Sequence, residues 1–281
     1  MSAPIQQGKG NYWIASYPKS GNTWLRLFLE TYMQNPEKPM HINDLPSGSF
    51  AYQRSTFDNM LGIETADYPP DLLTEMRPRV YDHLADPNAA QFIKTHERFT
   101  YTRSGEPVFS STSSAGAILI LRSPLDVAIS MSHFLRMSIE RTIARMAGAH
   151  ESPNQTLTDS VPHQTGSWSN FAQSWLDGTL PLHVMRYEDM LDTPEETFSK
   201  ALQFLKRPID ETRLQKAIAF TRFKTLQEQE RKDSFATMRT GAKAFFRQGK
   251  KDIWQSHLSS AQQLTLQKDH AEMMHKFGYL K

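Results

Sequence analysis

Residues 12–24 read YWIASYPKSGNTW, and this stretch decides the expected fold. An apolar, β-prone run from Tyr12 to Tyr17 ends at Pro18, and an amphipathic helical pattern opens at Trp24. A helix N-terminus presents unpaired backbone N–H groups and the positive end of the helix dipole, so it attracts anions. The stretch therefore predicts a strand, a tight turn and a helix that bind a phosphate or a similar tetrahedral oxyanion. The turn supplies a cation and small polar residues: Lys19, Ser20, Gly21, Asn22 and Thr23.

The turn differs from the Walker A loop of nucleotide-binding proteins. That loop reads G-x-x-x-x-G-K-[ST], with a glycine directly before the lysine. Here Pro18 precedes Lys19, and the nearby glycine, Gly21, comes after the lysine. The residues thus indicate an anion-binding turn of a different design. An ordinary strand–helix turn with a surface lysine is the alternative interpretation.

The composition restricts the classes of protein to consider. The 281 residues fit one large domain or two small ones, and 38% of them are hydrophobic, enough to fill a core. The formal net charge of +2 gives no global basic field, so we expect no nucleic-acid partner. The chain has no cysteine, which excludes disulfides and fits a reducing compartment. No signal-peptide pattern occurs in MSAPIQQGKG, and no apolar run reaches the ~20 residues of a membrane span. We therefore expect a cytoplasmic protein with no membrane partner.

Short β-like runs alternate with helical patterns along the chain. The third run, AILILR, is almost wholly apolar, as in a strand buried on both faces of a parallel sheet. The alternation predicts an α/β fold, with a single domain over 1–281 and a central, mainly parallel sheet flanked by helices. The expected strands are Tyr12–Tyr17, Ala90–Thr95, Ala117–Arg122 and Leu182–Tyr187. The expected helices are one that opens at Trp24, then Val127–Met137, Trp168–Leu176, Pro194–Leu205, Glu211–Phe220 and Ala261–Phe277.

Three long stretches fit this alternation poorly: about 34–80, 145–166 and 231–257. The first is rich in Pro, Tyr, Phe and Asp, the second is polar, and the third is basic and aromatic. Long irregular segments in a compact domain are usually functional loops or lids. We therefore expect these segments on the substrate side of the molecule.

Further candidates for chemistry follow the second and third expected strands. Open α/β sheets place their ligands at the carboxyl ends of strands, where Arg122 and the pair Lys94 and His96 stand. The Arg122 guanidinium and the Ser130 hydroxyl could hold a second phosphate, with pairing of Arg122 and Asp126 as the alternative. His96 is placed to act as a general base, since its ordinary pKa of about 6.5 lies near working pH. A purely structural histidine is the alternative, and no metal-ligand spacing occurs around it, so we expect no metal.

Taken together, these segments resemble the PAPS-dependent sulfotransferases of the cytosolic, small-molecule type. The resemblance rests on YPKSGNTW at 17–24, KTH at 94–96 and RSPLDVAIS at 122–130. An ordered set of motifs is far more specific than any single one, and this set covers most of the chain. The further matches are HF at 133–134, GSW at 166–168, YEDM at 187–190, TRFK at 221–224 and RQG at 247–249.

The resemblance implies sulfuryl transfer from PAPS, with PAP as product, to a hydroxyl or an amine of a small-molecule acceptor, without a metal. It implies a P-loop-like, nucleotide-kinase-like turn around the 5′-phosphosulfate. Lys19 would stabilise the leaving phosphate, and His96 would take the proton of the acceptor. The implied catalytic residues are Lys19, Lys94, His96 and Ser130. The implied cofactor-binding residues are Lys19, Ser20, Gly21, Asn22, Thr23 and Trp24, then Arg122, Ser130, Tyr187, Thr221, Phe223, Arg247, Gln248 and Gly249.

Within that set, the resemblance implies separate roles for the two ends of the nucleotide. Trp24 and Phe223 would sandwich the adenine, with Tyr187 and Thr221 nearby. The 3′-phosphate would be held by Arg122, Ser130, Arg247 and the backbone of Gln248 and Gly249.

Two segments depart from the pattern of the family. Its C-terminal loop usually reads R-K-G-x-x-G-D-W, whereas residues 247–254 read RQGKKDIW, which leaves the 3′-phosphate contacts open. Asn22 stands where a threonine is more usual and keeps a polar donor. The dimerisation segment that many cytosolic relatives carry has no convincing copy here, so the oligomeric state is also open.

Two other functions fit parts of the sequence. One is an ATP- and Mg²⁺-dependent small-molecule kinase with a divergent P-loop, and the other is a non-catalytic binder that uses the basic, aromatic segment 239–254. Carboxylates in the first irregular stretch would favour a cationic acceptor if they faced it, and a solvated loop face is the alternative (Asp44, Asp58, Glu64 and Asp67). The expected acceptor wall includes the loops around 145–166 and 234–246, together with Phe50, Tyr52, Phe57, Tyr68, His133, Phe134 and Met137.

Overall fold

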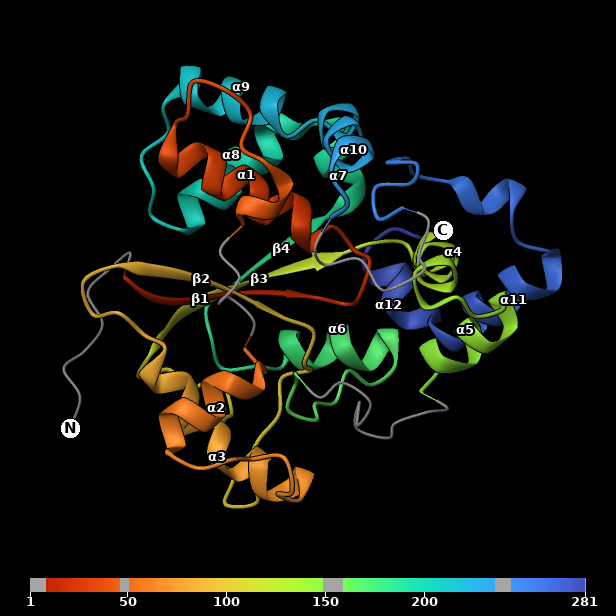
Figure 1. Cartoon of the computed structure of the whole chain (residues 1–281). Helices are drawn as coiled ribbons and strands as arrows, with labels where there is room; N and C mark the ends of the chain where they lie inside the picture. Colours follow the sequence, from red (N-terminus) through yellow and green to blue (C-terminus); the bar gives the residue numbers. More distant parts are fainter. Residues whose placement is uncertain (1–8, 46–50, 149–158, 236–243, 281) are drawn as a thin grey trace.

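The computed structural model describes residues 9–45, 51–148, 159–235 and 244–280. Its centre is a four-stranded, all-parallel sheet in the order β2-β1-β3-β4 (Figure 1). All four expected strands are present, so the parallel α/β fold predicted from the sequence is confirmed. The strands are β1 (Gly10–Ser16), β2 (Ala90–Thr95), β3 (Ser114–Leu121) and β4 (Leu182–Arg186).

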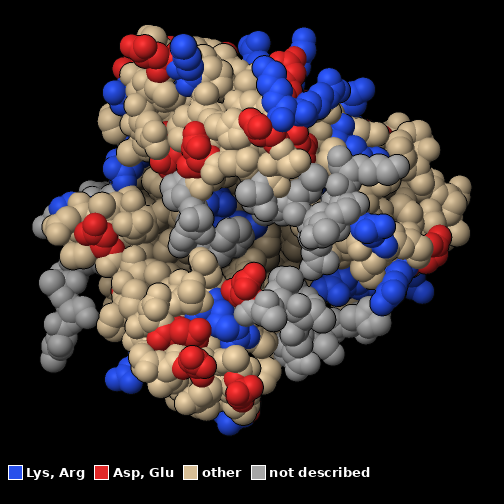
Figure 2. All heavy atoms as spheres, in the orientation of Figure 1, with Lys and Arg blue, Asp and Glu red and all other residues tan. Residues whose placement is uncertain are grey.

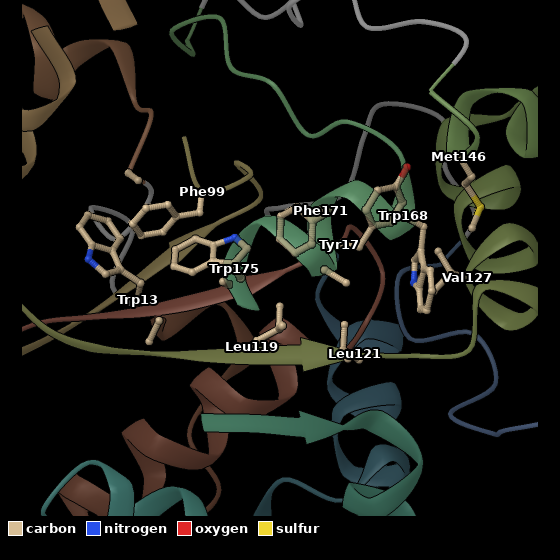
Figure 3. Close-up of a cluster of buried hydrophobic side chains, with 14 of the residues drawn as sticks. Trp13, Tyr17, Phe99, Leu119, Leu121, Val127, Met146, Trp168, Phe171 and Trp175 are labelled. Atoms are coloured by element: carbon tan, nitrogen blue, oxygen red, sulfur yellow. The ribbon is translucent and has the colours of Figure 1, made fainter. Parts of the chain in front are cut away.

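Both faces of the sheet are buried, and the side chains of β1 divide between them with a period of two. Trp13 belongs to the core on one face, whereas Tyr12 and Ile14 belong to the core on the other. The ring centroid of Trp13 lies 4.8 Å from that of Phe109. Aromatic side chains of α6 (Trp168–Leu176) cover the same face of the strands (Figure 3). Burial on both faces explains why β3 reads as a continuous apolar run.

Helices cover both faces of the sheet and extend beyond its carboxyl edge (Figure 1). None of those in the described segments combines the length and the apolar character needed to span a bilayer. One face carries α1 (Asn22–Gln34), α8 (Pro194–Phe204) and α9 (Glu211–Phe220), and the other carries α2 (Arg54–Leu61), α3 (Pro70–His83) and α6. The remaining elements are α4 (Pro124–Leu135), α5 (Ile139–Met146), α7 (Tyr187–Asp192), α10 (Phe223–Lys232), α11 (Ser260–Asp269) and α12 (Ala271–Lys276), with short 3₁₀ turns η1 (Ile42–Asp44) and η2 (Ile253–Ser256).

Several helices begin at residues that satisfy the free N–H groups of a first turn. Ser138, Ser167 and Ser259 precede α5, α6 and α11, and each side chain accepts a backbone N–H bond three residues later. Pro124 and Pro194 stand in the first turns of α4 and α8, where a missing N–H costs little. These local signals fix where the helices around the carboxyl edge begin.

The sequence-based expectations were wrong about several helices. The stretch 34–80 is less irregular than expected, because it contains α2 and most of α3. Pro70 in the first turn of α3 and Pro78 inside it disguise the helical pattern. The sequence pattern also missed α5 and α10. The helix expected over 261–277 is divided into α11 and α12 at His270.

Candidate active site

A cavity of about 540 Å³ lies beyond the carboxyl ends of the strands. The face of the molecule drawn in Figure 2 has a hollow near its middle, with Lys and Arg atoms beside it. We distinguish two sides of the cavity wall. The turn side includes residues 18, 19 and 21–24, with Arg122, Ser130, Phe134, Tyr187, Phe223 and 245–249. The loop side includes Tyr17, Tyr52, Gln53, Lys94, His96, Met131, Leu135, Arg145, Asp159, Ser160 and 163–166.

The turn after β1 has a backbone shape that requires its glycine. Lys19 and Gly21 have positive φ angles of 71° and 109°. A Cβ atom at Gly21 would lie 2.8 Å from the ring of Tyr187, so both conformation and space exclude a larger residue. α1 begins directly after this glycine, and its first three residues line the cavity. The expected strand, turn and helix are therefore present, with the helix N-terminus at the cavity.

The ammonium group of Lys19 lies against two aromatic rings. Its Nζ atom is 3.6 Å from the ring centroid of Phe245 and 4.5 Å from that of Phe134. Burial, assisted by the charge of Arg122, lowers the pKa of Lys19 to about 7, while the Glu230 carboxylate acts in the opposite direction. Without an anion beside it, Lys19 is therefore only weakly held in its charged form near neutral pH.

His96 follows β2, and the end of β1 fixes its tautomer. Nδ1 lies 2.6 Å from the carbonyl oxygen of Ser16, so Nδ1 bears the hydrogen and donates a hydrogen bond to that oxygen. Nε2 therefore keeps a free lone pair. Burial lowers the pKa of His96 well below its usual 6.5, and the charge of Lys94 acts in the same direction. His96 is therefore neutral at working pH, which is the form that a general base requires.

Lys94 lies two residues before His96 and also lines the cavity. Its side chain is buried, and that burial lowers its pKa to about 7, with smaller contributions from the charges of Arg26 and Lys19. Two lysines of lowered pKa therefore face the same cavity, as expected of a site that awaits an anionic ligand.

The side chain of Asn22 is directed toward β1 and away from a ligand. Its Nδ2 atom donates to the carbonyl oxygen of Ile14 at 2.7 Å and lies 3.2 Å from the Ser16 hydroxyl. Both bonds serve the strand, so any role of Asn22 in holding an anion belongs to its backbone. The carbonyl oxygen of Ser16 also accepts the hydrogen bond from His96 Nδ1. Asn22 is therefore linked to the histidine through a single residue, Ser16.

Arg122 extends from the end of β3 and connects two segments of backbone. Its terminal nitrogens donate to the carbonyl oxygens of Lys19 at 3.2 Å and Lys250 at 3.0 Å, and its guanidinium lies 4.3 Å from the Tyr187 ring centroid. The contact with Asp126, the alternative considered from the sequence, is loose at 3.9 Å. The buried Nε atom has no hydrogen-bond partner within the described residues. Arg122 thus retains an unused donor at the cavity.

Asp126 anchors the segment that departs from the family pattern. Its carboxylate accepts backbone N–H bonds from Asp252 at 2.8 Å and from Trp254 at 3.1 Å. Asp252 stands where the resemblance expects glycine, and it has the left-handed backbone that glycine favours, with φ of 58°. Arg247 donates to Nε2 of His133 at 2.8 Å. The altered loop is therefore still fixed against α4 and brings Arg247 to the cavity.

The aromatic residues expected at the nucleotide line the turn side. Trp24 lies edge-on to Tyr187 at 5.8 Å between ring centroids, and its indole N–H is buried without a partner in the described segments. A Cβ atom at Gly249 would lie 2.1 Å from the ring of Phe223, so only glycine can approach that ring so closely. Ser130 and Gln248 also line this side.

Two residues expected at the cofactor do not line the cavity. Ser20 is fully buried, and its hydroxyl has no partner among the residues described. Thr221 is buried and donates to the carbonyl oxygen of Ala217 at 2.7 Å. Their predicted roles would require a backbone contact or a shift of the side chain.

The expected acceptor wall is only partly assembled. Tyr52 and Phe134 line the cavity, whereas Phe57 belongs to the core and Tyr68 packs against that core. Phe50 lies outside the described residues, and neither His133 nor Met137 lines the cavity.

The loop side contains two functional candidates that no motif singled out, although both lie in the stretch 145–166 that the sequence analysis expected at the acceptor. His163 stacks on Tyr52 with 3.8 Å between ring centroids, and burial lowers its pKa to about 4. Arg145 comes from a helix that the sequence pattern missed. Across the described segments, no group of three or more His, Cys, Asp or Glu side chains is arranged to hold a metal ion.

Comparisons with known proteins agree with this geometry. The model of the sulfotransferase domain family matches residues 9–278. Sulfotransferase 1A1 of Canis lupus familiaris is 26% identical over 94% of this chain and 83% of its own length. Among solved structures, mouse sulfotransferase SULT7A1 complexed with PAP has a TM-score of 0.60 at 17% identity, covering 96% of this chain and 86% of its own. Retinol dehydratase in complex with androsterone and PAP has a TM-score of 0.63 at 16% identity, covering 96% and 81%. The chain therefore belongs to the sulfotransferase domain family, as the ordered motifs from the YPKSGNTW turn onward predicted.

Proposed function

We propose that the chain transfers a sulfuryl group from PAPS to a hydroxyl or an amine of a small-molecule acceptor. Beyond family membership, one observation carries the proposal: a single cavity joins Lys19 and the unused donor of Arg122 to a neutral His96. The kinase alternative has no such support, because the matching family is that of sulfotransferases and no glycine precedes Lys19.

The turn side has the donors that a doubly phosphorylated nucleotide needs. Two buried polar atoms there lack partners among the described residues, the Trp24 indole nitrogen and Arg122 Nε, and so does the Ser20 hydroxyl, which does not line the cavity. Unused buried donors are costly unless a ligand meets them, which supports an anionic ligand on this side. We assign the 5′-phosphosulfate to residues 19–23. We assign the 3′-phosphate to Arg122, Ser130, Arg247 and the backbone of Gln248 and Gly249, and the adenine to Trp24, Tyr187 and Phe223.

The reaction then needs little beyond positioning and charge. PAPS supplies an activated sulfuryl group whose S–O bond to the 5′-phosphate breaks while a new bond forms to the acceptor oxygen or nitrogen. Nε2 of His96 takes the proton that the acceptor loses. Lys19 neutralises the charge that grows on the leaving phosphate, and Lys94 adds a second donor nearby. The carbonyl oxygen of Ser16 holds His96 in the tautomer that this step requires, and Asn22 in turn donates to the Ser16 hydroxyl.

A small acceptor is the next part of the proposal. The structures of retinol dehydratase contain androsterone in one case and retinol in another. A cavity of about 540 Å³ that must also admit the nucleotide supports a small acceptor for this chain. We also propose a cytoplasmic location, which the absence of cysteine supports.

The donor is tested by ligand-dependent thermal stability. PAP and ADP with Mg²⁺ are compared at equal concentration, because they differ in the phosphate that Arg122, Ser130 and Arg247 would hold. PAP should raise the melting temperature more than ADP with Mg²⁺, since a ligand stabilises the state that it binds. Preferential stabilisation by ADP with Mg²⁺ would refute the PAPS assignment. The Arg122→Gln variant should lose the preference for PAP.

A further inference from the structure

The loop side of the cavity carries charge that the proposed chemistry does not use. Within the described residues, the cavity wall has one acidic side chain, Asp159, and several basic ones. Those already assigned lie near the nucleotide or the base: Lys19, Lys94, Arg122 and Arg247. Arg145 is the basic residue that remains. A cation without a role on a ligand-binding wall calls for an explanation.

Arg145 lies in the last turn of α5, and it lines the cavity. Its charge acts on Tyr17, the residue between β1 and Pro18, whereas the charges that act on His96 are those of Lys94, His163 and Lys19. The phenol ring of Tyr17 packs edge-on against Phe171, with 5.9 Å between centroids. Arg145 and Tyr17 therefore provide a second polar position on the wall of the cavity that His96 also lines.

Both groups retain hydrogen-bonding capacity. Across the described part of the chain, neither the Arg145 guanidinium nor the Tyr17 hydroxyl has a hydrogen-bond or ion-pair partner. Tyr17 is only 2% exposed, and burial raises its pKa, so its hydroxyl remains protonated and can donate. A guanidinium binds a carboxylate through two parallel hydrogen bonds, and a hydroxyl donor can add a third.

We propose that Arg145, together with the Tyr17 hydroxyl, binds an anionic group of the acceptor, a carboxylate in the first place, while His96 receives the proton at the reacting end. This inference rests on the proposed function. It replaces the cationic acceptor considered in the sequence analysis with an anionic one. The four carboxylates that suggested a cationic acceptor do not line the cavity: Asp44, Asp58, Glu64 and Asp67. The competing role for Arg145 is a favourable charge at the C-terminus of α5, which would not affect a ligand.

The test measures binding of two matched phenols to the PAP-loaded enzyme by calorimetry. 4-Hydroxyphenylacetate and 4-hydroxyphenylacetamide have nearly the same shape, and only the first carries a negative charge. The acid should bind at least about ten-fold more tightly than the amide, as expected for a charge-assisted hydrogen bond in a buried site. Turnover of both phenols with PAPS should show the same preference in KM.

Variants connect the preference to the two residues. Arg145→Gln should abolish the preference and leave amide binding within about two-fold, Arg145→Lys should keep part of it, and Tyr17→Phe should weaken only the acid, by a few-fold. Arg141→Gln is the matched control, because Arg141 lies on the same helix, is exposed and does not line the cavity.

Each outcome decides the matter. Equal binding of acid and amide, no binding of the acid, or an unchanged preference in Arg145→Gln would overturn the inference while PAP binding leaves the proposed function standing. If PAP itself does not bind, the proposed function fails and this inference fails with it. A loss of preference in the Arg141→Gln control would show a general effect of helix charge and would also overturn the inference.

Discussion

The turn side and the loop side of the cavity are built in different ways. On the turn side, the functional groups are tied to backbone: Arg122 donates to two carbonyl oxygens, and Asp126 accepts two N–H bonds of the final loop. On the loop side, the Arg145 guanidinium and the Tyr17 hydroxyl have no partner among the described residues. Both sides keep unused donors, since Arg122 Nε also lacks a partner in the described segments, but on the turn side Arg122 is fixed by its bonds to backbone, whereas the Arg145 guanidinium is not.

The difference matches the two tasks that a sulfotransferase must combine. The activated donor is the same molecule in every turnover, and backbone-anchored groups bind such a fixed ligand at low entropic cost. In the proposed function, the acceptor is recognised by side chains of the loop side, whose exchange should not disturb the backbone-anchored groups of the turn side. His96 lies where the two sides meet, since Ser16 holds it from β1 and its ring lines the cavity. Substitutions on the two sides should therefore affect different kinetic constants.

The largest effect is expected at that junction. His96→Ala should lower kcat by about 10²–10⁴ and leave PAP affinity nearly unchanged, because it removes the base without touching the nucleotide contacts. Turnover with PAPS and calorimetry with PAP measure the two quantities. His163→Ala is the matched control, since His163 is a second buried histidine on the same wall and stacks on Tyr52. If the control loses as much kcat as His96→Ala, the base has been misassigned.

The next effect tests the anchoring of the turn side. Asp126→Ala should weaken PAP binding by about 10–100-fold, because it releases the backbone of Asp252 and Trp254 and leaves Arg122 without its buried counter-charge. The acceptor KM should change little. Asp210→Ala provides the control, because Asp210 caps α9 on an exposed surface. Loss of this helix cap should lower the melting temperature without changing PAP affinity. Unchanged PAP affinity in Asp126→Ala would show that the loop does not depend on this carboxylate.

A pH dependence of PAP binding should follow from Lys19. Its pKa of about 7 in the free protein means that Lys19 is charged below pH 7 and loses its charge as the pH rises through 7. An anionic nucleotide needs the charged form, so binding above pH 7 must take up a proton, and affinity should fall by up to about ten-fold per pH unit. Activity should be lost only at a pH below 6.5, because protonation inactivates a general base and the pKa of His96 is lowered.

Calorimetry in buffers of different ionisation enthalpy measures the proton uptake directly. Lys94, whose pKa is also about 7, can contribute a second proton. Lys19→Met should therefore reduce the uptake at high pH by about one proton, and Lys94→Met is the matched comparison. Proton uptake that is identical in Lys19→Met and the parent would mean that Lys19 is already neutral, or already charged, throughout this pH range.

The turn side could be predicted from the sequence far better than the loop side. The strand, the turn and the helix start lie within residues 12–24, so local periodicity and one proline suffice to place Lys19. Arg122 and His96 could be placed because parallel strands end at a common edge. The cavity wall brings together Tyr17 and Arg145, and it stacks Tyr52 on His163, although the members of each pair are far apart in the chain. No local pattern encodes such long-range arrangements, and α5, which carries Arg145, has only 8 residues.

The smallest effect is expected on stability, at Asp252, whose side chain has no assigned role on the turn side. Asp252 has φ of 58°, a conformation that costs an ordinary side chain about 1 kcal/mol and glycine almost nothing. Asp252→Gly should therefore stabilise the protein by up to ~1 kcal/mol, reduced by the greater freedom of glycine in the unfolded chain. PAP affinity should hold, since the backbone N–H that reaches Asp126 remains.

Asp252→Ala separates this backbone effect from the loss of a charge. Alanine removes the carboxylate but keeps the Cβ atom, so this variant should be less stable than Asp252→Gly and no more stable than the parent. Chemical unfolding of the three proteins at one pH gives the comparison. If alanine and glycine stabilise equally, repulsion between Asp252 and Asp126 is the cause, since Asp252 acts on the buried Asp126 carboxylate. In that case charge repulsion at residue 252, and not its backbone conformation, limits the stability of the protein.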